Sequence, residues 1–230
     1  MATILNIETS GDICSVALSC DGMVEYQLED HQPMNHARKL APFIEKCMEE
    51  MSRRDMKADA VAVSIGPGSY TGLRIGLSTA KGLCFGLGIP LITISTLEIL
   101  AVKVMFRSME WTGDEILVPM LDARRMEVYT AAYDFALNKI ISPNPLILDE
   151  NSYKDLPDDR KILFFGSGAE KAKALVDIPR AEWIDGLNAY ARDMTALSEK
   201  AFRESRFADV AYAVPEYLKE FQASVPKNKL

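Results

Sequence analysis

The chain has 230 residues, of which 48% are hydrophobic, so it can bury one large core or two smaller ones. It carries 33 acidic and 26 basic residues, a formal net charge of -7, and its first thirty residues contain no lysine or arginine. A protein that binds nucleic acid by itself usually presents a basic stripe, so this composition argues against a free-standing RNA binder.

The four cysteines, Cys14, Cys20, Cys47 and Cys84, include no C-x-x-C pair, which argues against a zinc knuckle or a thioredoxin-type motif. We therefore expect reduced thiols and a cytoplasmic protein. No apolar run approaches the roughly 20 residues that span a bilayer, and the N-terminus lacks the basic region of a signal peptide. We expect no association with a membrane.

The first hundred residues predict the element order βββαβαβα. Strands are expected at residues 3–7, 15–19 and 23–28, because these apolar or alternating runs are bounded by turn signals. Apolar residues at helical spacing predict a helix from Ala37 to Met51, with a kink or a late start at Pro42. The remaining predicted elements are a strand at 60–65, a helix at 70–87, a strand at 90–94 and a helix at 96–106.

The second half repeats this order in a weaker form. Strands are expected at 116–121, at 127–135 and within 139–148, followed by a weak helix that starts near Asn151. The remaining predicted elements are a strand at 162–165, a helix from Ala169, a short strand near Trp183 and a helix at about 189–204.

Two features recur at matching points of the halves. An acid ends the first strand of each half, and a G-x-G loop follows the strand after the first helix; the residues are Glu8 and Asp122, Gly66 and Gly68, and Gly166 and Gly168. We therefore predict an α/β fold duplicated from two βββαβαβα subdomains, residues 1–106 and 107–230. That is the plan of the actin-like ATPase (ribonuclease H-like) superfamily. In that fold the nucleotide lies between the halves, so by analogy the acids and the glycine loops face a shared cleft.

The most specific stretch of sequence is residues 66–76, which reads G-P-G-S-Y-T-G-L-R-I-G. It lacks the G-K-[ST] of a Walker loop and the third glycine of a dinucleotide-binding motif. Backbone N–H groups where a glycine loop opens a helix could bind an anion. The glycines could equally serve a tight turn, so the spacing leaves both interpretations open.

The predicted helix after this loop contains Gly72, Gly76, Gly82 and Gly86. Each glycine inside a helix costs about 1 kcal/mol relative to alanine, so a close contact must offset the loss. Gly72, Gly76 and Ala80 form a stripe of small residues that lets another element approach closely. Either the protein's own sheet or a second subunit could fill that stripe.

The sequence contains few residues in the arrangements that are typical of catalytic or metal sites. His31 and His36 do not have the spacing of a zinc-binding pair, and His36 is expected to cap a helix or to lie at the surface. No G-x-S-x-G elbow is present and no serine has an assigned base, so peptidase activity is not expected. Asp122 could hold a Mg²⁺-nucleotide or pair with an arginine to fix its turn. Glu8, Thr9 and Ser10 could contact phosphate or cap their turn.

Several segments together resemble the TsaB family. Residues 4–10, which read I-L-N-I-E-T-S, are similar to its N-terminal I-L-x-I-D-T-S, and residues 66–76 match its glycine-loop string almost residue for residue. Glu8 replaces the family's aspartate, Ala37 its serine, Tyr70 its phenylalanine and Lys219 its arginine. Further similar segments are residues 35–42, 81–82, 90–91, 95–98, 122–129, 166–168 and 215–219.

The resemblance implies an actin-like fold and a non-catalytic subunit of the complex that makes threonylcarbamoyladenosine in tRNA. In that family the subunit pairs with the transferase TsaD through its first two helices, the small ATPase TsaE joins them, and the free subunit self-associates through the same surface. Relatives also carry the label M22 glycoprotease-like. We therefore expect indirect contact with tRNA, no bound metal, and ATP or ADP only at the level of the complex.

Two sets of residues follow from this reasoning. The expected partner interface lies on the first two helices, at Leu40, Phe43, Ile44, Cys47, Gly72, Leu73, Gly76, Leu77 and Ala80. The expected vestigial nucleotide cleft comprises Glu8, Thr9, Ser10, Gly66, Gly68, Asp122, Gly166 and Gly168. The alternative function is an active ATPase or small-molecule kinase, in which the two acids hold Mg²⁺ and the glycine loops cradle phosphate.

Overall fold

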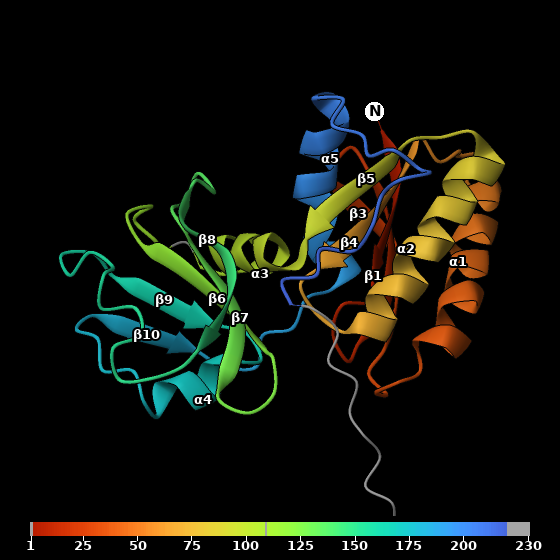
Figure 1. Cartoon of the computed structure of the whole chain (residues 1–230). Coiled ribbons are helices and arrows are strands. Elements are labelled where there is room, and N and C mark those ends of the chain that lie inside the picture. The colour runs from red at the N-terminus through yellow and green to blue at the C-terminus, as the bar shows by residue number, and fades with distance from the viewer. Residues whose placement is uncertain (1, 109, 220–230) are drawn as a thin grey trace, which may run out of the picture.

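A computed structural model describes residues 2–108 and 110–219, which fold into two lobes side by side (Figure 1). Each lobe is built on one five-stranded sheet. The strands of the first sheet are β1 (Thr3–Glu8), β2 (Cys14–Cys20), β3 (Met23–Asp30), β4 (Ala60–Gly66) and β5 (Leu91–Ser95). The strands of the second sheet are β6 (Ile116–Asp122), β7 (Glu127–Tyr133), β8 (Lys139–Ile147), β9 (Ile162–Phe165) and β10 (Ala181–Ile184).

The two sheets have the same connectivity. Their orders are β3-β2-β1-β4-β5 and β10-β9-β6-β7-β8, so the first strand of each half lies in the centre, with its two hairpin partners on one side. In both sheets the hairpin strands are antiparallel and the remaining strands are parallel. This common order confirms the internal duplication predicted from the sequence.

The helices are α1 (His36–Arg53), α2 (Tyr70–Leu87), α3 (Thr96–Met105), α4 (Ala169–Lys173), the 3₁₀ turn η1 (Ala191–Met194) and α5 (Thr195–Arg203). The predicted late start at Pro42 is wrong, because α1 begins six residues earlier at His36. The helix expected near Asn151 is also wrong, because that segment forms consecutive turns. The second half therefore has no counterpart of α1 in the described chain.

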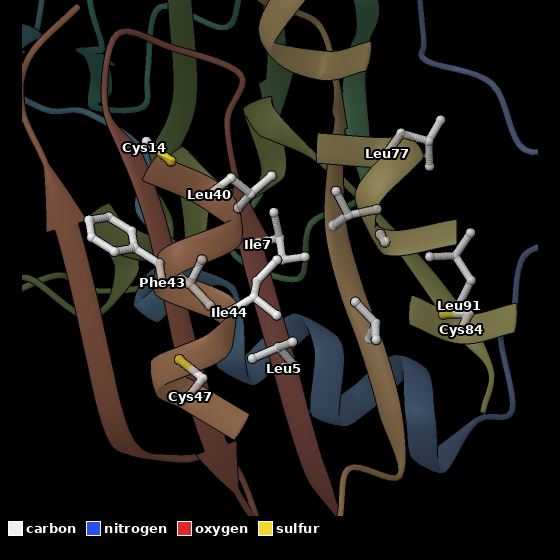
Figure 2. Packing of buried hydrophobic residues seen from close by; sticks show 14 residues of the cluster. Leu5, Ile7, Cys14, Leu40, Phe43, Ile44, Cys47, Leu77, Cys84 and Leu91 are labelled. Atoms are coloured by element: carbon white, nitrogen blue, oxygen red, sulfur yellow. The ribbon is translucent and has the colours of Figure 1, made fainter. Parts of the chain in front are cut away.

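The core of the first lobe lies between its sheet and the helix pair α1 and α2. Figure 2 shows Leu40 and Ile44 of α1 facing Leu5 and Ile7 of β1, and Phe43 belongs to the same buried cluster. The central strands β1 and β4 are buried on both faces, as expected for parallel strands covered by helices. The opposite face of the same sheet is covered by Met194 of η1 and by Leu197 and Ala201 of α5.

Helix α3 joins the two lobes. Its Ile99 and Val102 belong to the core of the first lobe. Its Leu97, Leu100 and Val104 pack instead among buried side chains of the second sheet. The expected boundary at residue 106 falls just after this helix. The C-terminal helix α5, expected with the second subdomain, returns to the first sheet because its apolar stripe faces strands β1 and β5.

None of the helices in the described part of the chain is long and apolar enough to cross a membrane.

The lobe junction gives a first prediction. Leu100 is fully buried between the lobes, so Leu100→Ala should lower the free energy of unfolding by about 2–5 kcal/mol, measured by urea denaturation. Leu87→Ala is the control, because Leu87 is 45% exposed at the end of α2 and should lose less than about 1 kcal/mol. Equal losses in the two variants would contradict the packing role of α3.

Candidate functional site

The turn after β1 is buried and closed on itself. Glu8 is 1% exposed, and its Oε1 accepts a hydrogen bond from the backbone N–H of Ser10 at 2.5 Å. Its Oε2 is buried without a hydrogen-bond partner among the described residues. Burial raises the pKa of this carboxyl above its ordinary value, against the opposing effect of the hydrogen bonds from Ser10. Burial therefore opposes the charged form of this carboxyl, which is the form that binds Mg²⁺.

The glycine loop lies directly against that turn. The N–H of Ser69 donates to the carbonyl oxygen of Ser10 at 2.6 Å, and a Cβ on Gly68 would overlap the same oxygen. Gly66 has φ +117°, and a Cβ there would lie 2.8 Å from the carbonyl oxygen of Glu216 in the C-terminal segment. The glycines at 66 and 68 are thus required by close contacts of the chain with itself. These contacts fit the tight-turn interpretation of the loop.

The small-residue stripe of α2 has the same explanation. Thr9 Oγ1 donates to the carbonyl oxygen of Gly72 at 2.8 Å, and a Cβ on either Gly72 or Gly76 would overlap atoms of Thr9. The stripe therefore lets α2 approach the turn after β1. Of the two alternatives that the sequence left open, contact with the protein's own sheet is the one found.

The structure corrects the residues expected at the partner interface. All nine are buried in the first lobe, on the sides of α1 and α2 that pack inward; they are Leu40, Phe43, Ile44, Cys47, Gly72, Leu73, Gly76, Leu77 and Ala80. The prediction failed because the apolar face of an amphipathic helix was assigned to a partner, whereas the sheet of the same lobe already covers it. A partner on these helices would meet their opposite, outward face.

That outward face of α2 has its own row, in which an arginine is followed by three small residues. Arg74, Ser78, Gly82 and Gly86 are all exposed and follow one another at four-residue spacing. Neither Gly82 nor Gly86 has any atom within 4 Å of the place where a Cβ would lie. Phe85 stands beside this row and is 86% exposed. We call Arg74, Ser78, Gly82 and Gly86 the outer row of α2.

A groove of about 660 Å³ borders this face of α2. Its walls come from the C-terminal half of α2 and from the segment after α5. The lining residues are Lys81, Gly82, Phe85, Asp209, Val210 and Ala211. The lining is mostly apolar, with one cationic and one anionic side chain.

In the second lobe, Asp122 fixes its own turn. Its Oδ1 accepts from the backbone N–H of Arg124 at 2.5 Å and from Lys171 Nζ at 2.9 Å. The expected pairing with an arginine side chain is therefore wrong; a lysine from α4 and a backbone N–H take that role. A Cβ on Gly166 would overlap the carbonyl oxygen of Met120, and one on Gly168 would lie 2.7 Å from Val128.

The residues of the expected nucleotide cleft are thus engaged separately in the two lobes. Glu8 and Gly68 contact Ser10, Thr9 contacts α2, and Gly66 lies against the carbonyl oxygen of Glu216. Asp122, Gly166 and Gly168 serve the packing around β6. A polar pocket of about 550 Å³ lies beside Gly166, Ser167 and Lys173. Among the described residues, no group of three or more histidine, cysteine, aspartate or glutamate side chains could hold a metal ion.

Sequence reasoning misplaced or missed several residues of this region. His36, expected at the surface or as a cap, is 6% exposed at the first position of α1. Phe85 was missed because an apolar residue in an apolar helix gives no sign of exposure. The sequence showed that Gly82 and Gly86 lower the stability of their helix, but it did not show which glycines of the helix face the sheet.

Comparison with known proteins gives consistent results. The family model of TsaD, described as tRNA N6-adenosine threonylcarbamoyltransferase, matches residues 31–227. The chain is 30% identical over 227 residues to the tRNA threonylcarbamoyladenosine biosynthesis protein TsaB of Bacillus subtilis (strain 168), covering 96% of each. It is 35% identical over 130 residues to the protein of the same name from Escherichia coli (strain K12), covering 56% of this chain and 54% of that one.

A solved structure also agrees over nearly the whole chain. It is a Pseudomonas aeruginosa protein described as having similarity to peptidase YEAZ. The TM-score is 0.81 at 27% sequence identity, covering 95% of this chain and 100% of the other. This agreement, together with the repeated sheet order, confirms the expected duplicated α/β fold.

The buried carboxyl of Glu8 gives a prediction on pH. Its pKa is raised in the folded state above its ordinary value, so its stabilising contribution is present below that ordinary value and is lost as the pH rises through the folded pKa. Glu8→Gln keeps an acceptor for the N–H of Ser10 and removes the charge. The stability of the variant relative to the wild type should therefore increase from about pH 5 to about pH 8 in urea denaturation. If the unfolding free energies of Glu8→Gln and the wild type changed in parallel over this pH range, the raised pKa of Glu8 would be contradicted.

The two faces of α2 give a further prediction. We call the stripe Gly72, Gly76 and Ala80, which faces the turn after β1, the inner row. Gly76→Ala should lower the free energy of unfolding by about 1–3 kcal/mol, because the new Cβ would overlap Thr9 Oγ1. Gly82→Ala should raise it by up to about 1 kcal/mol, because the position is open and alanine favours a helix. Chemical denaturation of both variants measures the difference. The opposite order of stabilities would show that the inner and outer rows are wrongly assigned.

Proposed function

The chain belongs to the TsaB family, and we propose that it is an auxiliary subunit of the assembly that makes threonylcarbamoyladenosine in tRNA. In this proposal the chain binds a TsaD-type transferase through the outward faces of α1 and α2 and carries out no chemical step itself. A TsaE-type ATPase joins the assembly, tRNA is contacted mainly by the other subunits, and the free chain pairs with itself through the same helices.

The outer row of α2 is the observation that carries this proposal. Gly82 and Gly86 lie inside a helix, where each costs about 1 kcal/mol relative to alanine. The inner glycines offset that cost through their contacts with Thr9, whereas a Cβ on Gly82 or Gly86 would meet no side chain of the described residues within 4 Å. A partner whose backbone approaches the outer row would use the space that the missing side chains leave. The exposed ring of Phe85 beside the row would supply apolar area for such a contact.

The family model that matches residues 31–227 supports the choice of partner. It describes the transferase itself, so the expected partner is a chain related to this one. Related chains can pair through equivalent surfaces, as identical subunits do across a two-fold axis. The adjoining face of α1 carries charges of both signs, including Arg38, Glu45 and Lys46, which suits pairing with a similarly mixed surface.

The alternative of an active ATPase or kinase has less support. Mg²⁺ would have to bind at Glu8, whose carboxyl is buried, has a raised pKa and accepts a hydrogen bond from its own turn. Phosphate would have to bind a glycine loop whose neighbours are the carbonyl oxygens of Ser10 and Glu216. Carbonyl oxygens repel phosphate oxygens, so this loop as folded is poorly suited to hold a nucleotide.

The proposal predicts the effect of bulk on the outer row. Gly82→Leu should weaken binding to a TsaD-type transferase by at least about tenfold, measured by isothermal titration calorimetry, because the new side chain would occupy the space of close approach. The fold should be retained, since no atom lies within 4 Å of the Cβ position.

Ala196→Leu is the matched control. Ala196 is an exposed small residue on α5, which covers the opposite face of the first sheet. This variant should bind the transferase like the wild type. Normal binding by Gly82→Leu, or equal loss in both variants, would contradict the proposed interface. Self-association of the free chain, followed by sedimentation, should be weakened by the same substitution.

A further inference from the structure

The segment after α5 crosses back over the first lobe. We call residues 205–219 the strap. The N–H of Ala208 donates to Leu91 O at 2.8 Å, and the N–H of Glu216 donates to Ile65 O at 2.7 Å. Between these points Lys81 Nζ donates to the carbonyl oxygens of Ala211 and Ala213. In Figure 1 the strap is the blue trace that leaves α5, crosses toward α2 and descends between the lobes.

Tyr217 anchors the strap to α2. Its hydroxyl accepts a hydrogen bond from Arg74 Nε at 2.9 Å, and its ring stacks on Tyr70 with the centroids 5.0 Å apart. The guanidinium of Arg74 also lies 4.1 Å from the centre of the Tyr70 ring. Stacking and cation–π contacts of this kind are individually weak at exposed sites.

Two residues further on, the strap reaches the second lobe. Lys219 Nζ forms an ion pair with Glu127 Oε2, 2.5 Å away at the start of β7. The strap therefore joins α2 of the first lobe to β7 of the second within three residues. The glycine loop leaves room for the strap. Gly66, at φ +117°, lies against the carbonyl oxygen of Glu216, and a side chain at position 66 would fill the space that this oxygen occupies.

The strap is attached weakly in comparison with the core. Its partly buried apolar side chains are small, namely Ala208, Val210 and Ala213. Two of its larger side chains are mostly exposed, with Tyr212 82% exposed and Val214 70% exposed. Segments with little buried apolar area and exposed hydrogen bonds open at lower free energy than the core.

Arg74 connects the strap to the outer row of α2. It is the first residue of that row, followed by Ser78, Gly82 and Gly86. A chain that packs along the row would therefore reach the guanidinium that holds Tyr217. The anchor of the strap and the proposed partner surface share this one side chain.

We propose that the strap is a releasable latch. When seated, it fixes the angle between the lobes by joining α2 to β7, and a partner on the outer row stabilises the seated state through Arg74. The second half of this statement rests on the function proposed above, whereas the latch itself depends on the chain alone.

The first test uses hydrogen exchange of the full-length chain. Tyr217→Ala should speed exchange of the Ala208 and Glu216 amides by about tenfold or more and leave the amides of β1 and β4 unchanged. Tyr212→Ala removes an exposed ring of the same strap and should change neither. Unchanged strap exchange in Tyr217→Ala, or equal acceleration in the two central strands, would overturn the latch.

A second measurement reports on the lobes. Spin labels on cysteines placed at Ala196 of α5 and Lys173 of α4, both exposed, measure the distance between the lobes in a Cys20→Ser background. The other cysteines are buried, and burial raises the pKa of Cys14 and Cys47 to about 12, which keeps them unreactive. The distance distribution should broaden in Tyr217→Ala and stay narrow in Tyr212→Ala. Equal distributions would contradict a role in fixing the lobe angle.

The coupling is tested by adding a TsaD-type transferase, with binding measured separately by calorimetry. If the transferase binds, strap exchange should slow in the wild type and in Tyr212→Ala but not in Tyr217→Ala. Binding without any slowing would refute the coupling. An absence of binding would refute the proposed function and with it the coupling, and the latch would still be judged by exchange and distances in the chain alone.

Discussion

The close approach of α2 to the turn after β1 is the constraint on which the first lobe depends. Gly72 and Gly76 leave room for Thr9, and Gly68 leaves room for the carbonyl oxygen of Ser10. Any larger residue at these positions would push the helix away from the sheet and open the core that α1 and α2 share. The same contacts close the turn around Glu8, so the packing of the helix and the burial of this carboxyl have a common cause.

This packing determines which side of α2 remains available. Once the inner row is used by the sheet, the outer row from Arg74 to Gly86 faces outward, beside the exposed ring of Phe85. The glycine loop and the first acid, which in an ATPase would serve the nucleotide, are engaged by the chain's own backbone and by the strap. A chain of this family built in this way is suited to hold a partner, and the proposed role as an auxiliary subunit follows from that arrangement.

Much of the fold could be predicted from the sequence, because the strands are apolar runs between clear turn signals and the duplication repeats an acid and a glycine loop. The bounds of α2 were also predicted correctly, at residues 70–87. The orientation of its glycines could not be predicted, since four small residues on one helix give no sign of which ones the sheet covers. The turns near Asn151 were mistaken for a helix because a weak apolar pattern in a diverged repeat does not separate the two.

The most direct test of the account asks which helix of the first lobe touches the partner. A photoreactive side chain placed at Ser78, in the outer row of α2, should cross-link to a TsaD-type transferase, whereas the same group at Ala196 of α5 should not. Both positions are exposed in helices on opposite faces of one sheet, so they differ mainly in location. Cross-linking from Ala196 alone, or equally from both positions, would contradict the claim that the outer row of α2 is the partner surface.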